Sequence, residues 1–204
     1  MIRSAAARPL GRRLLSAALL LCAACGAPPL AGDVAAADLS PVWEAWWQQE
    51  LEGAIDAADQ LGWDRTGSVA GERARQSLRS SRGERPALVA ELRSWREEAP
   101  ESPDLAYLEA RLLQDPARAE QRFRDLARRF PRHPWIRLGL ASLVQGDGAS
   151  PPVVRRLLAS APARSDAAAF RRQIEARLLA QEGDPEAAFS LLEADAFGRG
   201  DRDA

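Results

Sequence analysis

His133 is the only histidine in the 204-residue chain, so it is the first residue to consider for a metal site or a catalytic base. It precedes a proline at a predicted helix start, and the sequence offers no second histidine to share a metal ion with it. Paired carboxylates occur at Glu97-Glu98 and at Asp184 with Glu186. Each pair lies at a helix end or in a first turn, where acids favour the helix dipole. These positions predict no metal site and no catalytic residue.

Other sequence signatures of catalysis are also missing. The sequence has no Gly-rich phosphate loop, no G-x-S-x-G nucleophile elbow and no Cys/His pair. An enzyme would need a deep pocket with perturbed titratable groups, and the sequence locates none. We therefore expect a protein without a cofactor that is not an enzyme.

The first two dozen residues are typical of an export signal. Residues 1–13 carry four arginines and no acid, and residues 14–21 form a short apolar run that ends near Cys22 and Cys25. The run is well short of the ~20 residues that a membrane-spanning helix needs. The sequence predicts export of the chain rather than its insertion as a permanent helix.

The sequence C-A-A-C-G, from Cys22 to Gly26, resembles the lipobox of bacterial lipoproteins, with Cys22 as a departure where leucine is usual. The resemblance implies a signal peptide over residues 1–24 and attachment of diacylglycerol to Cys25, often with a further acyl chain. Two or three acyl chains anchor a protein stably, because each buried CH₂ adds about 0.8 kcal/mol. The implied location is the bacterial cell envelope, on the periplasmic face of the outer membrane. An ordinary cleaved signal with incidental cysteines is the alternative.

The charged residues do not predict a nucleic-acid partner. The chain has 28 basic residues, all of them arginine, against 29 acids, and its formal net charge is −1. No basic block stands alone. Residues 25–39 are rich in small residues without periodic hydrophobicity, so we expect a flexible tether with a reach of roughly 20 Å.

Pairs of a capping residue and proline mark helix starts along the rest of the chain. A Ser or Asp side chain accepts a hydrogen bond from an orphan amide, and proline suits the first helical turn. Seven starts carry the proline, of which the second and the fifth lack a good cap: Ser40-Pro41, Arg85-Pro86, Ser102-Pro103, Asp115-Pro116, His133-Pro134, Ser150-Pro151 and Asp184-Pro185. Two more starts are expected near Ser68 and Ser165. Helical stripes follow these starts and no stretch alternates as a strand, which predicts an all-α fold of about nine helices.

The sequence EARLL occurs twice, at Glu109–Leu113 and at Glu175–Leu179, 66 residues apart. Helices of this length are marginal alone, and repeating a two-helix unit lets each hairpin bury its apolar face on the next. The spacing corresponds to two units of 33 residues, close to the 34 of tetratricopeptide repeats. Between the copies, Trp135-x-x-Leu138-Gly139 matches the opening of the tetratricopeptide signature.

Residues 102–194 therefore resemble about three tetratricopeptide repeats, with a weaker fourth unit that ends at Pro100. Ser142 departs from the signature, which has tyrosine there. The resemblance implies a short α-solenoid of stacked helical hairpins; another α-hairpin bundle is the alternative. We expect a signal peptide (1–24), a tether (25–39), Trp-rich helices with a degenerate repeat (40–100), three repeats (101–196) and a disordered tail (197–204).

Three tryptophans lie close together in the first predicted helix. Helical spacing places Trp43 and Trp47 on one face together with Leu51 and Ile55, whereas Trp46 lies to one side. We expect Trp43 and Trp47 to cover the open N-terminal end of the core, with Trp46 at its rim. A contact surface for a partner or for lipid is the alternative.

In the tetratricopeptide family, the first helices of the units line a concave surface that binds extended peptides or helices. Carried over onto this sequence, that surface includes Tyr107, Arg111, Gln114, Arg137, Gln173 and Arg177. Such side chains suit an acidic or carboxylate-terminated segment, because guanidinium groups form charge-assisted, forked hydrogen bonds with carboxylates. Solvated arginines on ordinary helix faces are the alternative.

The sequence thus predicts an envelope lipoprotein that holds other envelope proteins near a membrane, as an interaction scaffold or an assembly factor. The alternative function is noncatalytic binding of cell-wall polymer or of a small ligand by the Trp-rich N-terminal helices. A polymer-binding surface would expose two coplanar tryptophans, whereas a scaffold would bury them.

Overall fold

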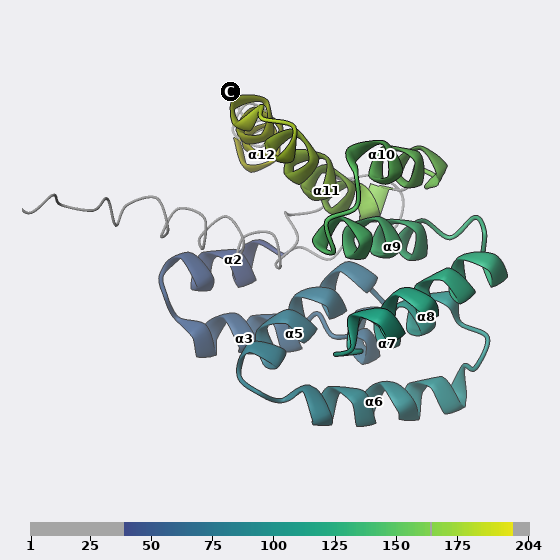
Figure 1. The fold of residues 1–204 in the computed structure, drawn as a ribbon. Coiled ribbons are helices and arrows are strands. Elements are labelled where there is room, and N and C mark those ends of the chain that lie inside the picture. Colours follow the sequence, from purple (N-terminus) through teal and green to yellow (C-terminus); the bar gives the residue numbers. More distant parts are fainter. Residues whose placement is uncertain (1–38, 164, 198–204) are drawn as a thin grey trace, which may run out of the picture.

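The computed structural model describes residues 39–163 and 165–197, and every regular element within these ranges is helical. This confirms the predicted all-α fold. In chain order (Figure 1), the elements are α2 (Ser40–Trp47), α3 (Leu51–Asp59), α4 (Trp63–Thr66), α5 (Val69–Ser81), α6 (Arg85–Glu98), α7 (Pro103–Arg111), α8 (Pro116–Arg129), α9 (Pro134–Gly146), α10 (Pro151–Ser160), the 3-10 turn η1 (Ser165–Ala167), α11 (Ala168–Gln181) and α12 (Pro185–Phe197). The predicted signal peptide, Cys25 and the predicted tail from residue 198 onward lie outside the described residues.

Consecutive helices pair into hairpins, and the hairpins stack. Helix α5 packs on α6, α7 on α8, α9 on α10, and α11 on α12. The first helices of successive hairpins, α5, α7, α9 and α11, also pack side by side in that order, and we call them the A-helices. Figure 1 shows the resulting solenoid-like stack, with α6 at one end and α12 at the other. The N-terminal pair α2 and α3 packs on α5.

Helix starts follow the predicted signals closely. All seven proline-marked starts coincide with observed ones, and α5 and η1 begin next to Ser68 and at Ser165. The side chains of Ser102, Asp115 and Asp184 accept hydrogen bonds from amides of the first turn, as predicted. Ser40 instead lies inside α2, because Leu39, which the sequence assigned to the tether, is buried and precedes the helix as its N-cap.

The N-terminal tryptophans depart from the prediction. The chain turns at residues 48–50, with Gln49 at φ +62°, so that two helices replace the single predicted one. Trp47 is 71% exposed, and the prediction that it covers the core is therefore wrong. Trp46 packs instead against a small apolar cluster, which is separate from the main core and consists of Val42, Ala54, Ile55, Ala58 and Leu78. Because this turn separates the two helices, residues before and after it do not lie on one helix face, although their spacing is helical.

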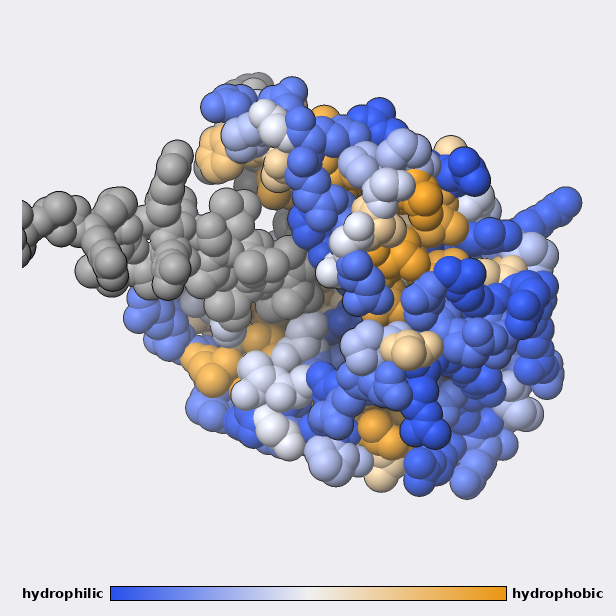
Figure 2. All heavy atoms as spheres, viewed as in Figure 1, coloured by the Kyte–Doolittle hydropathy of each residue, from blue (hydrophilic) through white to orange (hydrophobic). Residues whose placement is uncertain are grey.

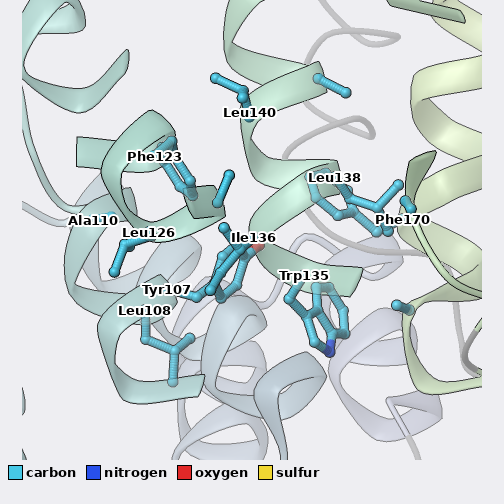
Figure 3. Packing of buried hydrophobic residues seen from close by; sticks show 14 of the residues in the cluster. Tyr107, Leu108, Ala110, Phe123, Leu126, Trp135, Ile136, Leu138, Leu140 and Phe170 are labelled. Carbon is cyan, nitrogen blue, oxygen red and sulfur yellow. The ribbon is translucent and has the colours of Figure 1, made fainter. Parts of the chain in front are cut away.

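A second and larger apolar core runs continuously from α5 to α11. Four rings are in sequence at its centre (Figure 3): Phe123 of α8 lies edge-on to Tyr107 of α7 at 5.9 Å, and Tyr107 lies 5.6 Å from Trp135 of α9. Trp135 stacks in turn on Phe170 of α11 at 5.9 Å. Such aromatic pairs contribute about 0.5–1.5 kcal/mol each beyond the burial of their area. Because three of the rings belong to successive A-helices, they hold the hairpins in register.

Gly139 leaves the space that this ring contact needs. A Cβ atom at this position would lie 2.5 Å from Cε1 of Phe123 and 2.9 Å from Cε2 of Tyr107. Both distances are far below van der Waals contact. The glycine of the W-x-x-L-G sequence is therefore required by the close approach of α9 to its neighbours.

Replacing Gly139 by alanine is expected to lower the free energy of unfolding by about 2 kcal/mol, because the added methyl group overpacks the core. Urea unfolding followed by circular dichroism measures this change. Gly146 is a matched control in the same helix, since a Cβ there meets nothing within 4 Å. Gly146→Ala is expected to keep or raise stability, by up to about 1 kcal/mol. Equal losses in the two variants would contradict the close-approach explanation.

Candidate functional site

The two EARLL copies occupy equivalent positions on the A-helices α7 and α11. Ala110 and Ala176 are buried where the helices cross, and the leucines that follow two residues later are buried as well. Arg111 and Arg177 are half-buried between them. The repeated sequence therefore reflects one packing arrangement that the chain uses twice.

Each of these arginines donates hydrogen bonds to the preceding A-helix. Arg111 Nη1 donates to Gln76 Oε1 at 2.8 Å, and its Nη2 donates to Ser77 Oγ at 3.4 Å, both on α5. Arg177 Nη2 donates to Ser142 Oγ on α9 at 3.0 Å. Gln76 and Ser142 each lie 35 residues before the arginine that they bind.

Glutamines of the preceding A-helix complete the contact. Gln76 Nε2 donates to the carbonyl oxygen of Leu108 at 3.5 Å, and Gln145 Nε2 donates to that of Ile174 at 3.2 Å. The two acceptors lie one helical turn before Arg111 and Arg177. A similar polar joint thus links α5 to α7, through Gln76, and α9 to α11, through Ser142 and Gln145. These glutamines and Ser142 were not predicted, although Gln76 and Ser142 are 66 residues apart, as the EARLL copies are.

The two arginines lack a counter-charge in the described part of the chain. Their hydrogen bonds go to amide, hydroxyl and carbonyl oxygens, and neither forms an ion pair with an acidic side chain there. Burial lowers the pKa of Arg177, because it removes water from the guanidinium group. The group stays charged, since the ordinary pKa of arginine lies far above neutral pH. We call Arg111 and Arg177 the arginine pair.

The other four predicted contact residues do not share this setting. Tyr107 is fully buried in the ring sequence, and Gln173 is only 4% exposed, so both are interior residues rather than surface ones. Gln114 is exposed in the connection between α7 and α8. Arg137 Nε donates to the carbonyl oxygen of Pro131 at 3.2 Å. The arginine pair is the part of the predicted surface that the structure places in equivalent surroundings.

Helix α5 of the first hairpin also contacts the third and fourth hairpins. Arg73 of α5 reaches Trp135 on α9 and Phe170 on α11, with its guanidinium carbon 5.0 Å and 3.6 Å from the two ring centroids. Helix α5 also packs on η1, just before α11. The inner surface of the stack is therefore filled at this end by side chains of the protein itself.

Helix α5 also carries a buried network of charges that was not predicted. Glu72 is fully buried and accepts hydrogen bonds from Trp63 N at 3.1 Å and from Arg75 Nη1 at 3.3 Å. Arg75 pairs in addition with Asp59 of α3 at 2.9 Å and with Glu91 of α6 at 2.5 Å. Burial raises the pKa of the Glu72 carboxyl, although the positive charge of Arg75 opposes this effect. The network ties the N-terminal pair of helices to the first hairpin.

His133 and the paired carboxylates have local partners or lie on the surface. His133 Nε2 lies 2.9 Å from Asp104 Oδ1, which joins the starts of α9 and α7. Asp184 caps α12, and Glu97-Glu98 are exposed at the end of α6. Within residues 39–163 and 165–197, no group of three or more His, Cys, Asp and Glu side chains is arranged to hold a metal ion.

Comparisons of the chain with protein-family models, with curated proteins and with solved structures find no match. None of the described helices is both long and apolar enough to cross a membrane. The residues of the A-helices are therefore the basis on which a function is inferred.

Replacing Glu72 by glutamine is expected to change how stability depends on pH. The folded-state pKa of Glu72 is raised above its ordinary value of 4.5, so the folded chain binds this proton more tightly than the unfolded chain does. The contribution of this proton to the free energy of unfolding is fully present below the ordinary pKa. It is lost as the pH rises through the raised folded-state pKa.

Relative to the original protein, Glu72→Gln should therefore become more stable as the pH rises from about 4 to about 7. Urea unfolding at a series of pH values measures the difference. Glu97→Gln, at an exposed position, is the control and should show no such trend. A difference for Glu72→Gln that does not vary with pH would contradict the raised pKa.

Proposed function

We propose that the chain is a lipid-anchored protein of the bacterial cell envelope that holds other envelope proteins through its stacked hairpins, and that it is not an enzyme. The anchor is inferred from the lipobox resemblance around Cys25, in the undescribed N-terminal residues. The observation that carries the binding proposal is the arginine pair. Both members are half-buried, occupy equivalent positions and face no acidic side chain of the described chain.

A half-buried cation without a counter-charge favours the binding of an anion. Partial burial removes water from the guanidinium group and disfavours its charged form, and a bound carboxylate offsets this cost through charge-assisted hydrogen bonds. The hydrogen bonds of the two groups use Nη1 and Nη2 of Arg111, and Nε and Nη2 of Arg177. One further nitrogen of each group keeps its hydrogen-bonding capacity for a ligand.

The spacing of the arginine pair favours an extended segment with acidic groups. Arg111 and Arg177 lie on α7 and α11, with α9 between them. Packed helices have axes about 8–10 Å apart, so the two steps amount to at most about 20 Å, which roughly six residues of extended chain span. An acidic segment of another envelope protein, with carboxylates separated by such a length, would reach both arginines.

The visible surface is consistent with recognition through charge. Figure 2 shows hydrophilic residues over most of this face, with apolar residues in separate patches. The large exposed apolar side chains in the described residues are spread over several helices and one connection: Trp47, Leu51, Leu113, Val153 and Phe189. Because these side chains come from separate elements, we favour a contact directed by charge over one apolar docking patch.

Binding of cell-wall polymer by the Trp-rich N-terminal helices remains the alternative. Stacking on a sugar polymer would need two exposed, coplanar rings. Trp47 is largely exposed, whereas Trp43 and Trp46 of the same helix are half-buried. One exposed ring supports the protein-binding proposal better than the polymer-binding one.

Replacing both Arg111 and Arg177 by glutamine is expected to weaken partner binding by at least about a hundredfold, because each hydrogen bond to a charged group contributes about 1.5 kcal/mol or more. Tagged full-length protein is used for affinity isolation from detergent-solubilised native membranes, and the affinity of the recovered partner is then measured. The double variant Arg111→Lys/Arg177→Lys keeps the charge but loses the planar fork. Its affinity for the partner should lie between that of the original protein and that of the double glutamine variant.

The control for this experiment is Arg124→Gln with Arg128→Gln on the exposed side of α8. These arginines pair with Glu120 and Asp125 of their own helix, so partner binding should be unchanged. Thermal unfolding confirms that each variant is folded. Full partner binding by a folded Arg111→Gln/Arg177→Gln variant would overturn the proposed role of the arginine pair.

Replacing Cys25 by serine is expected to release the protein from the membrane fraction, because diacylglycerol attachment needs the thiol of this residue. Cys22→Ser is the matched control, since the signal peptide that contains Cys22 is removed. Fractionation of cells that express each variant measures the effect. Membrane retention of Cys25→Ser equal to that of Cys22→Ser would rule out the lipid anchor.

A further inference from the structure

Arg73 is a buried arginine whose side chain lies against two aromatic rings. It is 6% exposed, and its guanidinium carbon lies 3.6 Å from the ring centroid of Phe170 and 5.0 Å from that of Trp135. Both distances are within the ~6 Å of a cation–π contact. The two rings are themselves stacked, with 20° between their planes. A single guanidinium group is thus held against a pair of rings.

An acidic side chain completes this setting. Asp166 of η1 is 8% exposed and accepts a hydrogen bond from Trp135 Nε1 at 3.1 Å. The bond fixes the orientation of the indole ring and holds a carboxylate next to it. We call Trp135, Phe170 and Asp166 the aromatic cage.

The residues of the cage also contact residues other than Arg73. Trp135 is held by its contact with Tyr107 and by its hydrogen bond to Asp166, and Phe170 is held by its stacking on Trp135. These residues belong to the second, third and fourth hairpins, whereas Arg73 belongs to the first. The residues of the cage therefore have contacts with one another besides those with Arg73.

The chemistry of the cage favours a guanidinium group over an ammonium group. A guanidinium group is planar, stacks on aromatic faces and is weakly hydrated, whereas an ammonium group is compact and strongly hydrated. Removing water from the first therefore costs less, and its flat face matches the face of the ring. Arg73, at 3.6 Å from the centroid of Phe170, shows this stacking distance.

We propose that the aromatic cage is a binding site for a guanidinium group, that Arg73 fills it in the free chain, and that an arginine of a bound partner segment takes its place when the Arg73 side chain leaves. The last step rests on the proposed function, because it assigns the incoming arginine to the partner. The selectivity of the cage for guanidinium does not rest on it. A partner would then contribute acidic groups to the arginine pair and an arginine to the cage.

The test empties the cage in the full-length protein with Arg73→Ala. Methylguanidinium, acetyl-arginine amide and methylammonium are added separately, and the midpoint of thermal unfolding is followed by circular dichroism. The first two are expected to raise the midpoint by about 2–4 °C once each exceeds its dissociation constant several-fold. Methylammonium is expected to leave the midpoint unchanged. No response to methylguanidinium, or an equal response to methylammonium, would overturn the proposal.

Arg73→Met is the matched control, because an unbranched apolar side chain fills the cage and leaves no place for the probes. An equal rise in Arg73→Met and Arg73→Ala would therefore also overturn the proposal. If Arg73→Ala does not fold, Arg73→Lys and Arg73→Met are compared directly. A guanidinium-selective cage predicts a lower midpoint for both variants than for the original protein, and a midpoint of either variant at or above that of the original protein counts against it.

The thermal-unfolding test with added cations distinguishes the cage from the proposed partner-binding site. It contains no partner protein and leaves Arg111 and Arg177 unchanged, so loss of the proposed function would not alter its outcome. Conversely, a cage that takes no guanidinium would leave partner capture by the arginine pair intact.

Discussion

The side-by-side packing of consecutive A-helices is the constraint on which the rest of the structure depends. A hairpin of two short helices cannot bury its apolar face alone, and here the rings of Tyr107, Trp135 and Phe170 bury it between successive hairpins. The approach is close because Gly139 has no side chain. Once the helices are this near to one another, Arg111 and Arg177 reach the preceding A-helix and become half-buried. The polar joints are thus a consequence of the apolar packing.

Helix starts could be predicted from the sequence because capping is a local interaction. Ser102 and Asp115 accept hydrogen bonds from amides two or three residues ahead, and the adjacent proline fixes the first turn. Helix α3 was missed because its N-cap, Glu50, makes no side-chain hydrogen bond and no proline follows it. Trp47 was assigned to the core because its helical stripe was continued through a turn that lacks a proline or glycine signal.

The surroundings of the candidate site were only partly predictable. The repeat period identified Arg111 and Arg177, because equal spacing in a stack of hairpins produces equal surroundings. Tyr107 and Gln173 were placed on the surface because the register of the tetratricopeptide family was carried over, whereas contacts between residues far apart in the sequence, such as that of Tyr107 with Trp135, bury them here. The burial of the charged residues on α5 also depends on contacts between residues far apart in the sequence. Glu72 and Arg75 carry no local sequence signal of burial, because Asp59 and Glu91, which pair with Arg75, are each 16 residues away from it along the chain.

The small apolar cluster between α2, α3 and α5 makes stability uneven along the chain. It is separate from the main core, and the N-terminal pair of helices is otherwise tied down by ion pairs such as Asp59 with Arg75 and Glu52 with Arg82. Such pairs weaken with ionic strength where they are exposed, whereas ring contacts in a core are insensitive to it. Opening of this pair of helices therefore costs less than global unfolding. We therefore expect the amide protons of α2 and α3 to exchange with solvent ahead of those in α7 to α11.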